Sequence, residues 1–145
     1  MESIRCPFCP PPADRVVASK DLAVAIRDGY PVSPGHTLVI PKRHVASLAD
    51  VTKEEAEALW SLLAEARARL DVELKPDGYN VGVNDGRAAG QTVMHLHVHL
   101  IPRYEGDRAD PRGGVRWVMP ERADYWSGPE VKLPSPIALN GSEAV

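Results

Sequence analysis

The sequence predicts an α+β domain with a mainly antiparallel five-stranded sheet, one long helix and an irregular C-terminal extension. One segment has apolar residues at helical spacing, and short runs with a period of two lie on both sides of it. The links between successive strand-like runs are short and rich in turn residues, which favours antiparallel pairing. With 145 residues, the chain is long enough for one domain with a buried core.

Three strands are expected before the helix, at residues 15–19, 22–27 and 36–40. Lys20 and Asp21 join the first two strands. The segment between the second and third strands is rich in Asp, Gly, Ser and Pro, which are turn residues. The third strand contains the apolar run Leu38–Ile40 and stops at Pro41, so we expect it to be buried.

The helix is expected from Thr52 to about Leu74. Thr52 and Glu55 have the spacing of a capping box, which marks the first turn. Pro76 and the Asp-Gly pair after it end the segment. The apolar residues at helical spacing should pack against the sheet; they are Ala56, Leu59, Leu63, Ala66 and Leu70.

Two further strands should follow the helix, at residues 79–84 and in the histidine-rich run that ends near Pro102. A polar, glycine-rich loop at residues 85–91 connects them. The later run at residues 115–119 has a β-like pattern. We place the domain at residues 1–126 and a poorly structured tail at residues 127–145.

Composition narrows the classes of function. The net charge is −3, which gives no broad basic surface for nucleic acid. No apolar stretch approaches the length of a membrane span, and the N-terminal residues lack the pattern of a signal peptide. We therefore expect a cytoplasmic protein with neither a nucleic acid nor a membrane as its partner.

Three histidines alternate with aliphatic residues in the run MHLHVHL. If this run is a strand, His95, His97 and His99 project from one face and the aliphatic side chains enter the core. Histidine acts as a metal ligand, nucleophile or proton shuttle near neutral pH, so the pattern indicates a site. Gln91 and Thr92, at the end of the glycine-rich loop, should lie at the mouth of this face.

The two cysteines, Cys6 and Cys9, have the C-x-x-C spacing of a metal knuckle or a redox pair. The prolines at residues 10–12 do not allow the long helix that follows a thioredoxin-like motif, which favours metal. Two histidines would complete a Cys2His2 set, although the spacing is not that of a zinc finger. On composition alone, His44 is better interpreted as a solvated loop residue.

Two longer segments, DGYPVSPGHTLVIPKRHV and NDGRAAGQTVMHLHVHL, resemble the histidine triad (HIT) superfamily of nucleotide hydrolases and transferases. The resemblance extends from Cys6 to about Pro102 and includes the pattern of N-x-G, G-Q-[ST] and H-x-H-x-H. A weaker likeness to bacterial members continues through GDRADPRGGVRWVMPERADYW. It implies a HIT-like fold and, by analogy with simpler members, a homodimer.

The resemblance also implies roles for individual residues. It assigns His97 as the nucleophile that attacks the α-phosphorus of a nucleotide, and His99 as a hydrogen-bond donor to the phosphate. The other matching positions are expected to bind the nucleotide: Asp28 at the ribose, Asn84, Gln91 and Thr92 at the phosphates, and Ile26 at the base. His36 also matches a frequent histidine position, without an assigned role.

The metal site gains its full ligand set from the same resemblance. Some branches of the superfamily hold zinc with C-x-x-C, the histidine after P-K-x and the first histidine of the triad. These residues are Cys6, Cys9, His44 and His95. Four protein ligands leave no open position, which implies structural Zn²⁺.

The sequence is compatible with several functions. The leading hypothesis is a hydrolase that releases a nucleoside monophosphate from dinucleoside polyphosphates or nucleoside 5′-phosphoramidates. A nucleotidyltransferase or phosphorylase would use the same intermediate with another acceptor. A non-catalytic nucleotide-binding module with structural zinc is a third reading. A redox metal bound by the three histidines is least favoured, because their strand carries no carboxylate.

Overall fold

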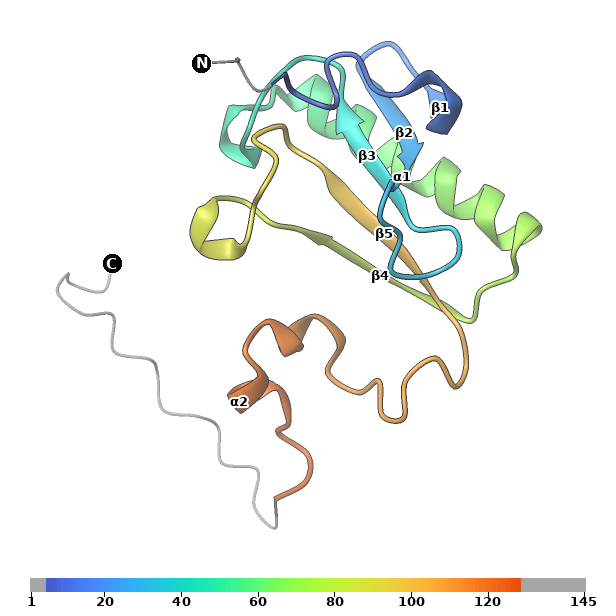
Figure 1. Cartoon of the computed structure of the whole chain (residues 1–145), viewed down its shortest axis with the longest axis vertical. Coiled ribbons are helices and arrows are strands. Elements are labelled where there is room, and N and C mark those ends of the chain that lie inside the picture. The colour runs from blue at the N-terminus through green and yellow to red at the C-terminus, as the bar shows by residue number, and fades with distance from the viewer. Residues whose placement is uncertain (1–4, 129–145) are drawn as a thin grey trace, which may run out of the picture. The chain divides into compact units, whose positions relative to one another are not determined.

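The computed structural model describes residues 5–128 and contains one five-stranded sheet in the order β1-β2-β3-β5-β4 (Figure 1). All four strand pairings are antiparallel. The predicted fold class is confirmed. The strands are β1 (Val16–Ser19), β2 (Ala23–Arg27), β3 (Thr37–Pro41), β4 (Gly78–Val83) and β5 (Val98–Arg103).

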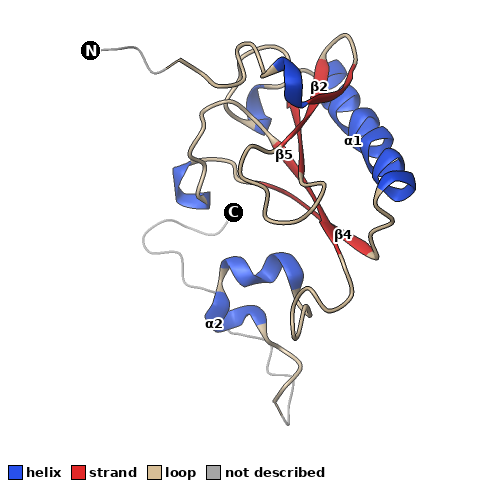
Figure 2. Ribbon diagram, turned by 45° about the vertical axis from the view of Figure 1, so that its right-hand side comes forward, coloured by secondary structure: helices blue, strands red, loops and turns tan. Residues whose placement is uncertain are grey.

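The long helix α1 (Lys53–Glu73) covers one face of the sheet (Figure 2). The predicted capping box is present: the Glu55 N–H donates to Thr52 Oγ1, and the Thr52 N–H donates to Glu55 Oε1. Of the predicted apolar stripe, only Ala56 is not fully buried. The core between α1 and the sheet includes Leu59, Leu62, Leu70, Leu96 and Leu100.

The opposite face of the sheet carries a second apolar cluster, formed by Phe8, Val24, Ile26, Leu38 and Ile40. Cross-strand register brings Ile26 opposite Leu38, and Leu38 opposite His99. Residues directly opposite each other in an antiparallel pair point to the same face. His99 therefore lies on the face that α1 leaves uncovered, next to apolar side chains.

The histidine run enters the sheet later than predicted. Strand β5 begins at Val98, so His95 and His97 precede it in an extended segment. The Pro41 carbonyl, which could otherwise continue the β-ladder, accepts a hydrogen bond from the His95 ring. The aliphatic residues between the histidines are buried in the core beneath α1, as the alternation predicted.

Short helices occupy several of the connections. They are the 3-10 helices Ala13–Arg15, Leu48–Asp50, Arg87–Ala89 and Gly114–Val118, and the helix α2 (Pro120–Ala123). The prediction of a β-like run at residues 115–119 was wrong. The segment Gly114–Val118 forms a 3-10 helix, and the Trp117 Nε1–H donates a hydrogen bond to the Arg112 carbonyl. In the described range 5–128, no helix is long and apolar enough to cross a membrane.

Two compact units divide the chain, with the boundary after Asp107. The first contains the sheet and α1. In the second unit, two guanidinium groups stack on aromatic rings. Arg112 lies 4.9 Å from the ring centroid of Trp126, and Arg116 lies 4.8 Å from that of Tyr125. The predicted boundary at residue 126 stays a prediction, and all but two residues of the predicted tail at 127–145 lie outside the described residues.

Candidate active site and metal centre

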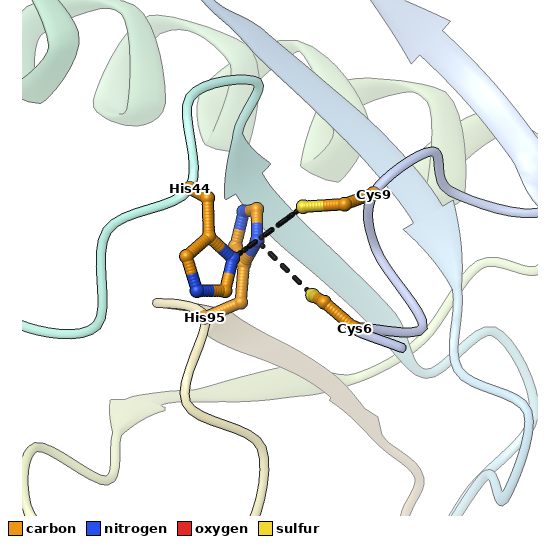
Figure 3. A group of neighbouring side chains, drawn as sticks. All are labelled: Cys6, Cys9, His44 and His95. Carbon is orange, nitrogen blue, oxygen red and sulfur yellow. Dashed lines mark hydrogen bonds between the residues drawn. The ribbon is translucent and has the colours of Figure 1, made fainter. Parts of the chain in front are cut away.

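Cys6, Cys9, His44 and His95 converge from three separate parts of the chain (Figure 3). The cysteines lie in the N-terminal loop, His44 in the loop after β3, and His95 in the segment before β5. The two histidine Nδ1 atoms are 3.2 Å apart. The His95 Nδ1 atom lies 3.5 Å from Cys6 Sγ and 3.4 Å from Cys9 Sγ, and Cys9 Sγ is 3.4 Å from His44 Nδ1.

These distances fit a tetrahedral zinc ion. Zn–N and Zn–S bonds of about 2.0–2.1 Å and 2.3 Å place tetrahedral ligands about 3.3 Å apart for N···N and about 3.6 Å for N···S. The His95 Nε2 atom donates to the Pro41 carbonyl at 2.8 Å, which leaves the Nδ1 lone pair directed at the sulfurs. Burial lowers the pKa of His95, and the neutral ring is the form that binds metal.

The loop that carries His44 is anchored to α1. Arg43 binds the Glu55 carboxylate with two nitrogens, at 2.6 Å and 3.2 Å, and its Nη2 also donates to the Asp50 carbonyl. Hydrogen bonding from Arg43 is the largest contribution that lowers the Glu55 pKa to about 2. This bidentate pair fixes the backbone next to a metal-ligand candidate.

His97 has the geometry of a nucleophile. Its Nδ1 lies 2.8 Å from the His95 carbonyl oxygen. A carbonyl only accepts, so Nδ1 carries the proton and the Nε2 lone pair is free. The ring is buried, and its neighbours include Phe8 and His99, whose ring centroids lie 5.7 Å and 5.1 Å away. A neutral imidazole held in this tautomer can attack an electrophile.

His99 has the opposite tautomer, and His36 sets it. The Val32 N–H donates to His36 Nδ1 at 3.1 Å, so the neutral His36 ring carries its proton on Nε2. That Nε2 lies 2.9 Å from His99 Nδ1, which must accept. The His99 proton is therefore on Nε2, where it can be donated to an anion. Burial is the main cause that lowers the His99 pKa to about 4, so the ring is neutral near pH 7.

Asp28, His36 and His99 form a second cluster of metal-ligand types, but their hydrogen bonds do not fit a metal. Metal binding at His36 Nε2 would move the ring proton to Nδ1, which would then face the Val32 N–H. Asp28 Oδ1 accepts from the Tyr30 N–H, and Oδ2 lies 3.4 Å from His36 Nε2. An open pocket of about 560 Å³ beside this cluster is lined by Asp28, His36 and the turn at residues 31–35.

The other residues that we predicted to bind the nucleotide differ in their burial and hydrogen bonding. Ile26 is fully buried in the apolar cluster. The register that pairs Val83 with Val98 carries Asn84 alongside His97, and Asn84 is half-buried. Thr92 is exposed. No hydrogen bond to the Asn84 or Thr92 side chain is found within residues 5–128.

Gln91 holds the glycine-rich loop in place. Its Oε1 accepts from the Gly86 N–H at 2.8 Å, and its Nε2 donates to the carbonyls of Ala46 and Val93. The side chain is 5% exposed. In this structure, its polar atoms are therefore bonded to main-chain groups of Ala46, Gly86 and Val93.

Two residues that contact the histidines of the site, His36 and Phe8, were given no role from the sequence. His36 is 3% exposed and determines the tautomer of His99. Phe8 is buried and contacts the rings of both His95 and His97. Position alone could have suggested Phe8, since it lies between the two cysteines. His36 was noted as a frequent histidine position of the family, but no local signal in the sequence indicates that it bonds to His99.

An antiparallel sheet covered on one face by one helix, with three closely spaced histidines at the start of a central strand, defines a small α+β domain with a histidine cluster. Residues 12–106 match the family model described as HIT domain. The chain belongs to the HIT family.

Characterised relatives and a solved structure agree with this membership. The chain is 41% identical over 93 residues to AP-4-A phosphorylase from Mycobacterium tuberculosis, covering 63% of this chain and 48% of that protein. It is 41% identical over 87 residues to bis(5'-adenosyl)-triphosphatase from Dictyostelium discoideum, covering 60% and 58%. A Zn-bound histidine triad family protein from Mycobacterium smegmatis is 38% identical, with a TM-score of 0.59, covering 66% of this chain and 69% of that one.

The matched region is only part of these proteins. The chain spans about half to three-fifths of the length of the curated relatives named above, and 62–63% of two further ones.

Proposed function

We propose that the protein is a nucleotidyl hydrolase that cleaves at the α-phosphate of dinucleoside polyphosphates or nucleoside 5′-phosphoramidates. The observation that carries this proposal is the pair of opposite tautomers at His97 and His99. One ring presents a free Nε2 lone pair, and its neighbour presents an Nε2–H donor. A nucleophile beside a donor to the phosphate is what attack on a phosphoryl group requires.

In the first step, His97 Nε2 forms a bond to the α-phosphorus and the bond from that phosphorus to the leaving oxygen or nitrogen breaks. The leaving group departs with the electron pair, a polyphosphate as its anion and an amine after taking a proton from solvent. His99 Nε2–H stabilises charge on a phosphate oxygen. Water then attacks the phosphorus, the N–P bond breaks and His97 regains its lone pair. The water proton passes to solvent and a nucleoside monophosphate is released.

The remaining residues bind and orient the nucleotide in this proposal. Asp28 Oδ2 accepts from the ribose hydroxyls, while its Oδ1 stays on the Tyr30 N–H. Asn84 and Thr92 donate to phosphate oxygens, and Gln91 acts by holding the loop that carries Thr92. Ile26, with its apolar neighbours, lines the base pocket. The partner is a small nucleotide, and the cytoplasmic location stays a prediction.

Product analysis tests the reaction. Diadenosine tetraphosphate and adenosine 5′-phosphoramidate are incubated separately with the protein and with His97→Ala, and the products are separated by chromatography. AMP is expected from the intact chain, with a loss of at least about 10³-fold in the variant, because its nucleophile is gone. Equal AMP release by the variant would overturn the covalent mechanism.

Phosphorolysis is a second candidate, favoured by the 41% identity to AP-4-A phosphorylase. The same intermediate would then be resolved by inorganic phosphate in place of water. Adding phosphate to the tetraphosphate assay separates the two reactions: hydrolysis yields AMP and ATP, whereas phosphorolysis yields ADP and ATP.

We also propose that Cys6, Cys9, His44 and His95 hold structural Zn²⁺. The support is the spacing of their four ligand atoms and the Zn-bound relative. When bound, the ion supplies cross-linking of three chain segments, since four protein ligands leave no site for reactive water. Burial and, after it, the neighbouring Cys6 raise the Cys9 pKa, so binding releases a proton from that thiol.

Metal analysis of Cys9→Ser tests this site. We expect about one zinc per chain in the intact protein, and loss of zinc together with a lower Tm in the variant. His36→Gln is the matched control, because it alters the other histidine cluster and should keep the metal. Unchanged stoichiometry in Cys9→Ser would exclude the four-ligand site.

A further inference from the structure

The metal-site residues and the nucleophile are linked by two direct contacts. The first is through the main chain: His95, whose Nδ1 faces the cysteines, offers its carbonyl oxygen to His97 Nδ1 at 2.8 Å. The second is through Phe8, whose ring centroid lies 5.7 Å from those of both His95 and His97. The interplanar angles of 90° and 65° are those of edge-to-face packing.

The position of Phe8 depends on the cysteine turn. The Phe8 N–H donates to Cys6 Sγ at 3.4 Å, and the Cys9 N–H donates to the Cys6 carbonyl at 3.2 Å. Phe8 is therefore tied by its backbone to one ligand candidate and flanked in sequence by two. Its ring is buried in the apolar cluster with Ile26 and Leu38, on the face of the sheet that carries His99.

We propose that Phe8 is a positioning residue for His97, and that metal binding at the four-residue cluster orders the nucleophile through Phe8 and the His95 carbonyl. This inference rests on the proposed function only in naming His97 the nucleophile. The two contacts hold the His97 ring in one orientation, with Nδ1–H on the carbonyl and Nε2 free. Without metal, the four ligand groups lose their common bond, and the cysteine turn is held only by packing and hydrogen bonds.

The test compares four full-length proteins: the intact chain, Phe8→Leu, Cys9→Ser and the control Leu63→Ala. Leu63 is buried in the core between α1 and the sheet, on the face opposite to the apolar cluster of Phe8, and has no role in the proposed sites. Three quantities are measured at one neutral pH: zinc per chain, the nitrogen-15 shifts of the His97 ring, and kcat and KM for diadenosine tetraphosphate.

Phe8→Leu is expected to keep its zinc, because the Phe8 contact to Cys6 is made by the backbone. Its His97 nitrogen shifts should move from those of a pure Nδ1–H tautomer toward the average of both tautomers. The kcat should fall by about ten- to a hundredfold with little change in KM, since misplaced reacting groups cost rate more than binding. Cys9→Ser should lose zinc and show the same shift change, while Leu63→Ala should match the intact chain in all three quantities.

The proposal is overturned if Phe8→Leu has the His97 shifts and kcat of Leu63→Ala, or if a folded, zinc-free Cys9→Ser keeps the intact shifts. The shifts and zinc content are read without turnover. If the intact chain releases no nucleotide, the proposed function fails, while the shifts still decide whether Phe8 and the metal order His97.

Discussion

At the scale of single residues, the chemistry rests on which ring nitrogen of each histidine is already bonded. His95 and His97 each donate one N–H to a main-chain carbonyl. His36 accepts a hydrogen bond from a main-chain N–H at Nδ1 and donates its Nε2–H to His99. Backbone groups, whose positions the sheet fixes, therefore choose the tautomers. Neighbouring imidazoles with the same side-chain chemistry acquire different roles in this way.

Replacing His36 tests this arrangement. His36→Leu removes the donor to His99 Nδ1, and we expect kcat to fall by about ten- to a hundredfold, because His99 is then free to place its proton on the wrong nitrogen. His36→Gln keeps an N–H donor and should recover part of the rate. Steady-state kinetics with diadenosine tetraphosphate measure both effects.

The two His36 variants control for each other, because only His36→Gln keeps an N–H donor at this position. Zinc content should be the same in both, since His36 does not belong to the cysteine cluster. Equal kcat in His36→Leu and the intact chain would contradict the assigned tautomer of His99.

At the scale of elements, the start of α1 is joined to the loop of the proposed metal site. The same Glu55 carboxylate closes the capping box with Thr52 and binds Arg43, the residue before His44. Glu55 is 3% exposed, which is unusual for a carboxylate and is explained by its partners. The helix terminus thus supports the loop that presents His44.

Glu55→Gln should weaken this junction without removing the cap, because a glutamine Oε1 can still accept from the Thr52 N–H. We expect a loss of about 1–2 kcal/mol in the free energy of unfolding and a Tm lower by about 3–8 °C. Glu57→Gln is the matched control: Glu57 is 68% exposed and 3.9 Å from Lys53, and it should change little.

The pH dependence has a definite sign. The folded-state pKa of Glu55 is about 2, below its ordinary value of 4.5. Its contribution is therefore complete above about pH 4.5 and is lost as the pH falls from 4.5 toward 2. Urea unfolding across this range should show a smaller acid loss of stability in Glu55→Gln than in the intact chain. Identical curves would show that Glu55 contributes no pH dependence.

Most of the elements could be predicted from local signals, whereas part of the site could not. The ends of α1 follow from Thr52, Glu55 and the Pro-Asp-Gly segment, and the strands lie within three residues of the expected limits. Two findings depend on tertiary contacts that no local pattern contains. His36 and His99 are 63 residues apart in sequence, and the Gln91 bond to the Ala46 carbonyl spans 45.

The triad itself shows the same division. The period-two alternation correctly placed the aliphatic residues in the core. It could not show that the His95 ring would take the Pro41 carbonyl and delay the strand to Val98. The four proposed metal ligands were predicted by resemblance to a family, and the convergence of their atoms is what the structure adds.

At the scale of the whole molecule, the sheet ends in two open edges, β1 and β4. Within residues 5–128, no strand pairs with the outer edge of β4, so its outward N–H and C=O groups are available to another chain. Antiparallel pairing of two β4 strands would join two sheets around a twofold axis. We propose a homodimer on this basis, in agreement with the resemblance noted from the sequence.

Light scattering on the purified chain measures the mass of the particle and so tests the proposed homodimer. The expected mass is twice the 15.8 kDa of one chain across a range of protein concentrations. Gly82→Pro, near the C-terminal end of β4, is expected to shift the mass toward one chain, because proline disrupts strand pairing. A mass of 15.8 kDa for the intact chain would refute the dimer.

The order of the four metal-site residues along the chain has a consequence for synthesis. Cys6, Cys9 and His44 are made first, and His95 is added only after α1 and β4. A growing chain therefore offers three ligands and an open fourth position, the pattern of a labile site. The closed set exists only once β5 begins to enter the sheet between β3 and β4. Tight retention of zinc would thus coincide with completion of the sheet, so a chain arrested before His95 would release its metal readily.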